Sequence, residues 1–276
     1  MVKDQLFAEV FMVQHGWSTD GVYYDGVLGL GPKNGNSSMG TENLVTAMYH
    51  QGLIDENLFS LATPYNEGDV GEMILGGIPR DVDSDTIKWI PLSNKTFTFF
   101  DIRSSWQVSV SSVVVGDGTL VNTTIAPNST AWVETEMPFI FLPDAMVNEI
   151  HTLIHAREIG WSPFYSVPRK RDEFPDIVFC FAGEEVKITG FDYTICDEGD
   201  CVSMLMGNGV DDLVVLGGGF LRGVKSIFDL EGDKVGCKFS AHLEYSAHPT
   251  NMLTTGHSFG TRSSRMKAGK GTFILC

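Results

Sequence analysis

The sequence predicts an all-β fold built from two similar β units. Strand-like runs, which are short, rich in β-branched and aromatic residues and bounded by Gly, Asp, Asn or Pro, occur along most of the 276 residues. Helical periodicity is confined to two short stretches, 43–51 and 144–156. An acidic residue followed by an apolar strand and then glycines occurs twice, at 25–31 and 212–219, which indicates two related units.

Eight runs are predicted as strands. They are 5–13, 22–30, 71–76, 87–92, 106–115, 177–181, 213–216 and 225–230. The run 106–115 alternates until Asp117-Gly118, which is a hairpin turn signal, so we expect this run to be the half-buried arm of a hairpin. The second helix is expected to begin at Pro143, before a capping Asp144.

Composition restricts the partners of the chain. The 35 acidic and 19 basic residues give a formal net charge of −16, which repels phosphate backbones, so we expect no nucleic-acid partner. The longest apolar runs are only a few residues, whereas a helix needs roughly 20 to cross a bilayer, so we expect no membrane span. The oligomeric state is left open.

Two features concern the cellular compartment. Four N-x-[ST] sequons are candidate N-glycosylation sites of a secreted chain, at Asn36, Asn94, Asn122 and Asn128. Residues 1–7 read as an alternating strand, so no signal peptide is visible in this chain.

Cys196 and Cys201 flank a segment typical of a hairpin loop, so we expect either a short disulfide between them or two free thiols.

Nine segments stand in a definite order along residues 4 to 240. They are Asp25-Gly-Val-Leu-Gly-Leu-Gly, Asn43-Leu-Val, 51–61, Met73-Ile-Leu-Gly-Gly-Ile, Trp89-Ile-Pro-Leu, 106–116, Phe174-Pro-Asp-Ile-Val-Phe, Leu216-Gly and 228–236. In this order they resemble the pepsin-like aspartic peptidases of the peptidase A1 type. The resemblance implies a bilobal fold, with an incomplete first lobe at 1–92 and an essentially whole second lobe at 93–240. Residues 241–276 carry four basic residues against one acidic, and we expect a basic, flexible tail there.

The resemblance also implies where a catalytic site would stand. The family uses two aspartates that share one proton across a bound water, and each stands in an Asp-Thr-Gly turn. Glu134 takes the position of the second aspartate and Thr135 is a remnant of its motif, but Glu136, Met137 and Pro138 replace Gly-Thr-Ser. Glutamate shifts the carboxylate by about an ångström, which costs on the order of a hundredfold in rate. No Asp-Thr-Gly occurs in the chain, so no residue stands for the first aspartate.

The predicted function is that of a pseudo-enzyme. The family hydrolyses peptide bonds at acidic pH, and we expect this chain to be catalytically inactive as it stands. One alternative is a non-catalytic binding or inhibitor-like protein that holds a peptide or protein in the groove between the lobes. A second alternative is residual aspartic-type proteolysis that uses Glu134.

The remaining expectations concern metals, cofactors and location. His151 and His155 are four residues apart, but no H-E-x-x-H pattern accompanies them, so we expect ordinary surface or core histidines and no metal site. The resemblance implies no cofactor, and it implies a secreted or vacuolar location.

Overall fold

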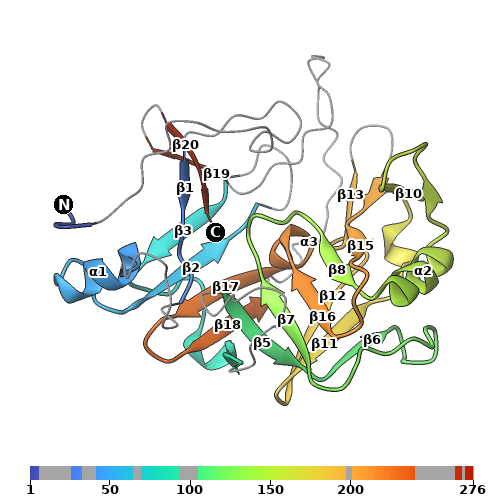
Figure 1. Cartoon of the computed structure of the whole chain (residues 1–276), viewed down its shortest axis with the longest axis horizontal. Coiled ribbons are helices and arrows are strands. Elements are labelled where there is room, and N and C mark those ends of the chain that lie inside the picture. The colour runs from blue at the N-terminus through green and yellow to red at the C-terminus, as the bar shows by residue number, and fades with distance from the viewer. Residues whose placement is uncertain are drawn as a thin grey trace.

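The computed structural model describes residues 1–5, 26–32, 42–64, 70–93, 105–196 and 201–239, together with the backbone of 265–268 and 271–275. Strands dominate these ranges, where they form five sheets, and the helices are short (Figure 1). The all-β expectation is therefore confirmed. In the ranges just given, no helix combines the length and the hydropathy needed to cross a bilayer.

A five-stranded antiparallel sheet joins the first part of the chain to the last. In spatial order it contains β3 (Glu72–Leu75), β2 (Leu58–Ala62), β17 (Val224–Asp229), β18 (Lys234–Phe239) and β4 (Lys88–Pro91). In Figure 1 the blue-green β2 lies beside the orange β17, although about 160 residues separate them in the sequence. The two parts of the chain consequently share one hydrophobic core, which runs from Phe59 to Phe228 and on into the second lobe.

A second five-stranded sheet carries the segment around Glu134. Its order is β15 (Leu205–Gly207), β8 (Ile140–Leu142), β16 (Leu213–Leu216), β7 (Ser129–Val133) and β5 (Trp106–Val110). Strand β16 runs parallel to β7 and antiparallel to β8. All four residues of β16 are buried, as is typical of a strand covered on both faces.

The described residues also form three smaller sheets. One contains β13 (Thr194–Cys196), β14 (Cys201–Ser203), β10 (Tyr165–Val167) and β9 (Arg157–Glu158). Another contains β12 (Glu184–Ile188), β11 (Ile177–Phe181) and β6 (Ser112–Val115). The third contains β1 (Gly26–Leu28), β20 (Gly271–Leu275) and β19 (Arg265–Ala268), at the upper left of Figure 1. The last two of these strands lie within 241–276.

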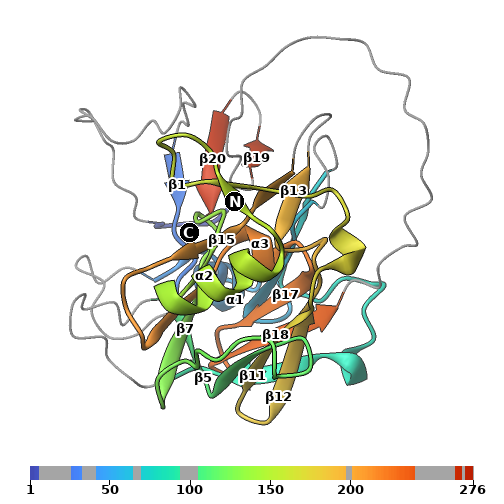
Figure 2. The same cartoon turned by 90° about the vertical axis from the view of Figure 1, so that its right-hand side faces the viewer.

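Within the described ranges, three α-helices and two short 3-10 turns connect the strands. The helices are α1 (Leu44–His50), α2 (Asp144–Leu153) and α3 (Gly218–Leu221), and the turns are Ser84–Thr86 and Arg171–Glu173. The Asn43 side chain caps α1 by accepting a hydrogen bond from the Thr46 N–H. Helix α2 lies on the side of the molecule that faces the viewer in Figure 2.

The expected capping role of Asp144 is wrong. Pro143 occupies the N-cap position of α2 and makes no side-chain cap, while Asp144 is the first helical residue. Its Oδ1 atom accepts a hydrogen bond of 2.9 Å from the N–H of Gly209, which belongs to the loop between β15 and β16. The Asp144 carboxylate therefore accepts from a distant loop and does not cap the N–H groups of its own helix.

The expected hairpin at 106–115 is also wrong. Ser111 interrupts the run and divides it into β5 and β6, which belong to different sheets. The Ser111 N–H donates to the carbonyl oxygen of Cys180 at 2.9 Å, so the strand turns toward β11, which is the partner of β6. Asp117 lies in a turn after β6, but the strand that follows does not pair with β6.

Five predicted strands agree with the structure to within about one residue at each end. The runs 71–76, 87–92, 177–181, 213–216 and 225–230 correspond to β3, β4, β11, β16 and β17. Of the run 22–30, the structure gives residues 26–28 as strand β1. Nearly all of the run 5–13 lies outside the described residues.

Candidate active site at the Glu134 turn

Residues 134–139 form the turn between β7 and β8, and three backbone hydrogen bonds hold it. The Glu134 N–H donates to the carbonyl oxygen of Leu216, the last residue of β16, at 3.2 Å. The N–H groups of Gly218 and Gly219 donate to the carbonyl oxygens of Met137 and Pro138 at 2.7 and 2.9 Å. The turn therefore lies directly against the glycine run that follows β16.

Gly217 allows this close approach of two backbone segments. A Cβ atom at this position would collide with the carbonyl oxygens of both Met137 and Phe139. Because these atoms belong to the backbone, neither could move aside without displacing the turn. Glycine at position 217 is thus a packing requirement of the Glu134 turn.

The Glu134 carboxylate folds back onto its own turn. Its Oε1 atom accepts a hydrogen bond of 3.1 Å from the N–H of Glu136. Burial raises the pKa of Glu134, the hydrogen bond from Glu136 opposes that shift, and the negative charge of the Glu136 carboxylate adds to it. Glu134 therefore retains its proton to a higher pH than an ordinary glutamate does.

Thr135 lines a small apolar hollow where the two parts of the chain meet. The other lining residues come from the segment after β1 and from β2, β5, β7 and β17, namely Leu30, Phe59, Leu61, Trp106, Val133 and Phe228. The volume of the hollow is about 10 Å³, which is close to the space of a single water molecule. It is too small to accept a substrate side chain.

A larger surface pocket lies elsewhere and shares no lining residue with the Glu134 turn. Its volume is about 290 Å³, and it is lined by Tyr49, Asp55, Glu56, Asn57, Leu58, Asp229, Glu231 and Gly232. Its carboxylates are not arranged to bind a metal, because the part of the chain that the structure describes holds no such group of three or more His, Cys, Asp or Glu side chains.

The two histidines singled out from the sequence have different surroundings. His151 is buried on α2, where its Nε2 atom lies 2.9 Å from the Ser203 hydroxyl and its ring lies 4.2 Å from that of Tyr165. Burial lowers the pKa of His151 to about 4. His155 follows the helix and has a left-handed backbone, with φ 55°. Since α2 ends at Leu153, the two side chains do not share one helical face.

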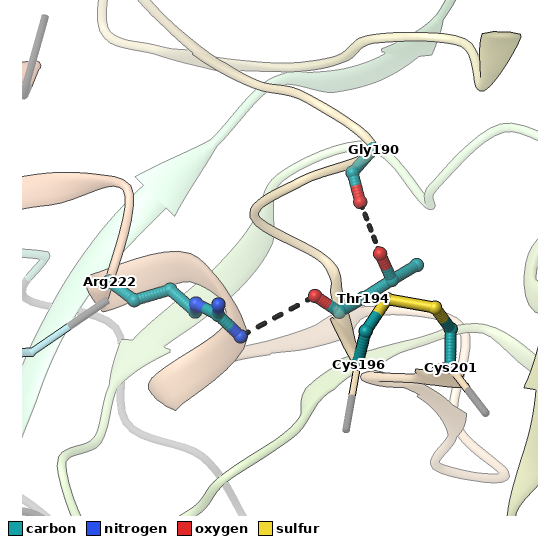
Figure 3. Close-up of a disulfide and its surroundings, with 5 residues drawn as sticks. All are labelled: Gly190, Thr194, Cys196, Cys201 and Arg222. Atoms are coloured by element: carbon teal, nitrogen blue, oxygen red, sulfur yellow. Dashed lines mark hydrogen bonds between the residues drawn. A yellow bond between two sulfur atoms is a disulfide. The ribbon is translucent and has the colours of Figure 1, made fainter. Parts of the chain in front are cut away.

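Two of the cysteines are bonded to each other, and two of the four sequons lie within the described residues. Cys196 and Cys201 form a disulfide that joins β13 to β14, and the Arg222 guanidinium donates to the Thr194 carbonyl oxygen beside it (Figure 3). Asn122 and Asn128 are both exposed. The other two sequons, Asn36 and Asn94, lie outside the described residues.

Comparisons with known proteins agree with the fold. A family model described as eukaryotic aspartyl protease matches residues 1–239. The vacuolar protease A of Aspergillus fumigatus is 31% identical to this chain over 223 residues, which are 77% of this chain and 52% of that protein. The vacuolar aspartic protease of Candida albicans is 29% identical, over 77% of this chain and 49% of its own length. Pepsin A of Sus scrofa is 26% identical, over 77% and 53%. The chain thus spans about half the length of the curated relatives it matches.

Proposed function

Because the chain belongs to the eukaryotic aspartyl protease family, we propose that it is a non-catalytic member of that family. The family reaction needs a carboxylate that is free to take a proton from water and to return it. The observation that carries the proposal is the missing partner of Glu134, since the sequence contains no Asp-Thr-Gly and so no residue that stands for the first aspartate. The Glu134 carboxylate accepts one hydrogen bond, at Oε1 from the N–H of Glu136, but without that aspartate it has no partner with which to share a proton across a bound water.

Two further features of the turn support the proposal. Glu136 stands where the family has a small glycine, and its carboxylate adds a negative charge beside Glu134. Pro138 has no N–H, so the turn lacks one backbone donor that could orient a carboxylate. Both changes lie within five residues of sequence and do not depend on any other part of the chain.

A direct test is peptide hydrolysis by the purified chain at acidic pH. We expect no cleavage of an unfolded protein substrate across the acidic range and no binding of a statine-type inhibitor. Near-UV circular dichroism of the same sample at the same pH would establish that the protein is folded. Cleavage that the inhibitor blocks and that Glu134→Gln abolishes would overturn the proposal.

Residual aspartic-type proteolysis is the second candidate, and the raised pKa of Glu134 favours it. A carboxyl group that keeps its proton above the usual range can donate that proton to a substrate carbonyl. This function needs a second carboxylate from elsewhere, such as a segment of a longer protein or another chain. Glu134→Asp would distinguish the two candidates, because it should raise a residual activity and leave a non-catalytic protein unchanged.

The non-catalytic protein is proposed to act by binding a peptide or protein and to reside in a vacuole or outside the cell. The relatives named vacuolar proteases support this location. The disulfide supports it as well, since such bonds form and persist in oxidising compartments. Capture of a binding partner by the folded chain, and its loss on adding excess competing peptide, would test the binding role.

A further inference from the structure

One end of the second lobe presents a sequon whose asparagine is exposed in the folded chain. The loop between β6 and β7 contains Asn122-Thr-Thr, and Asn122 is exposed. In the described part of the chain, the side-chain amide of Asn122 makes no hydrogen bond. The acceptor group for N-glycosylation therefore faces no competing protein partner.

Helix α2 fixes the backbone beneath this side chain. The Asn122 N–H donates to Oε2 of Glu149 at 2.6 Å, and the Thr123 N–H donates to Oε1 at 3.1 Å. The Thr123 hydroxyl also donates to Oε1. These bonds engage the backbone and the middle residue of the sequon, and they leave Asn122 and Thr124 exposed.

The neighbouring sequon is presented differently. Asn128 is exposed and has a left-handed backbone with φ 60°, which asparagine tolerates better than most residues. Its third residue, Thr130, is only 1% exposed and pairs with Ser109 and Leu213 inside the sheet. The hydroxyl that the modifying enzyme must recognise is thus accessible only before β7 enters the sheet.

Both sequons lie at the end of the sheet opposite the Glu134 turn. Strand β7 begins directly after Asn128 and ends directly before Glu134, which separates the two by roughly 20 Å at about 3.3 Å per residue. Strand β8 runs back along the sheet and leads into α2, which carries Glu149 and so holds the Asn122 loop at this end.

We propose that Asn122 carries an N-linked glycan and is modified more fully than Asn128. In the transfer, the amide nitrogen of Asn122 forms a bond to the anomeric carbon of a lipid-linked oligosaccharide diphosphate. The bond from that carbon to phosphate breaks, the lipid diphosphate leaves, and the amide gives up one proton. The disulfide between Cys196 and Cys201 supports a passage through the same oxidising compartment. The inference does not rest on the loss of catalysis at Glu134.

The test uses the natural protein from the cells that make it. Peptides from this protein are treated with peptide N-glycosidase in heavy-oxygen water, which converts each glycan-bearing asparagine to an aspartate that carries the heavy isotope. Mass spectrometry then gives the labelled fraction at each sequon. We expect a higher fraction at Asn122 than at Asn128. No label at Asn122, or a fraction no higher than that at Asn128, would overturn the proposal.

Two variants at Thr124 provide a matched control in the same host. Thr124→Ala removes the sequon and Thr124→Ser keeps it, while both alter one exposed side chain. We expect the label at Asn122 to disappear in the first variant and to persist in the second, with the label at Asn128 unchanged. Persistence of the label in Thr124→Ala would show that the modification does not follow the sequon and would overturn the assignment.

Discussion

The indole N–H of Trp106 donates a hydrogen bond of 3.0 Å to the carbonyl oxygen of Leu30. The two residues are 76 positions apart, and both are buried. The Trp106 ring packs edge-on against Phe59 and Phe228, which are themselves stacked with their centroids 4.7 Å apart. One aromatic cluster and one hydrogen bond therefore connect the segment after β1 with strand β5 of the second lobe.

Replacing Trp106 should destabilise the whole chain. Trp106→Phe keeps most of the ring contacts but leaves the buried Leu30 carbonyl without this donor, which costs about 1–3 kcal/mol. Trp106→Ala also leaves a cavity and should cost about 3–5 kcal/mol. Urea unfolding followed by far-UV circular dichroism would measure both. Equal free energies of unfolding for the two variants would contradict the separate contribution of the ring.

Replacing Gly217 should disturb the Glu134 turn in particular. Gly217→Ala places a Cβ atom against the carbonyl oxygens of Met137 and Phe139, and such overpacking costs about 1–3 kcal/mol. Gly29→Ala is the matched control, because a Cβ atom at Gly29 would meet no atom within 4 Å. We expect thermal unfolding to show a lower midpoint for the first variant and an unchanged midpoint for the second. A similar decrease of the unfolding midpoint in both variants would contradict a specific requirement for glycine at position 217.

His151 should make the second lobe sensitive to acid. Burial lowers the pKa of His151 from 6.5 to about 4, so the unfolded chain binds a proton at a higher pH than the folded chain does. The contribution of neutral His151 to the free energy of unfolding is therefore fully present above about pH 6.5. On the order of 3 kcal/mol of it is lost as the pH falls to about 4. His151→Gln can still hydrogen-bond to Ser203 but does not titrate. Its unfolding free energy should vary less than that of the wild type over this pH window, and an identical dependence would refute the assignment.

Glu149 should add a second acid-sensitive contribution. Hydrogen bonds from the Thr123 hydroxyl and from the Asn122 and Thr123 N–H groups lower the pKa of Glu149. A lowered pKa means that the stabilisation is present above the pKa of the unfolded chain and is lost as the pH falls through that of the folded chain. Glu149→Gln should thus be less stable than the wild type at neutral pH, and the two should converge at strongly acidic pH. A difference that stays constant with pH would contradict this account.

The sequence predicts those elements whose signals are local. Strands β11 and β16 are short apolar runs between turn residues, and α1 begins at an asparagine that caps it, so propensity and periodicity suffice for them. The division of 106–115 at Ser111 depends on the carbonyl oxygen of Cys180, which is 69 residues away. Likewise, the Asp144 side chain accepts from Gly209, a donor that only the folded chain brings near.

The candidate site follows the same division. Resemblance to the family places Glu134 at the end of an apolar strand, and the structure has β7 ending at Val133. The hydrogen bond between Glu134 and the Glu136 N–H depends on the shape of the turn. Positions 136–138 of this turn differ from the family motif, so the motif does not predict that shape. The need for glycine at 217 becomes visible only when the carbonyl oxygens of Met137 and Phe139 lie beside it.

Hydrolysis of an unfolded protein substrate at acidic pH, measured side by side for the chain and for Glu134→Gln, shows whether Glu134 acts as a catalytic carboxyl group. Both samples should be shown to be folded at the assay pH, since His151 and Glu149 limit stability in acid. We expect the same background rate for the two proteins, with or without a statine-type inhibitor. A higher rate for the chain, lost in Glu134→Gln and blocked by the inhibitor, would contradict it and would identify Glu134 as a working catalytic carboxyl group.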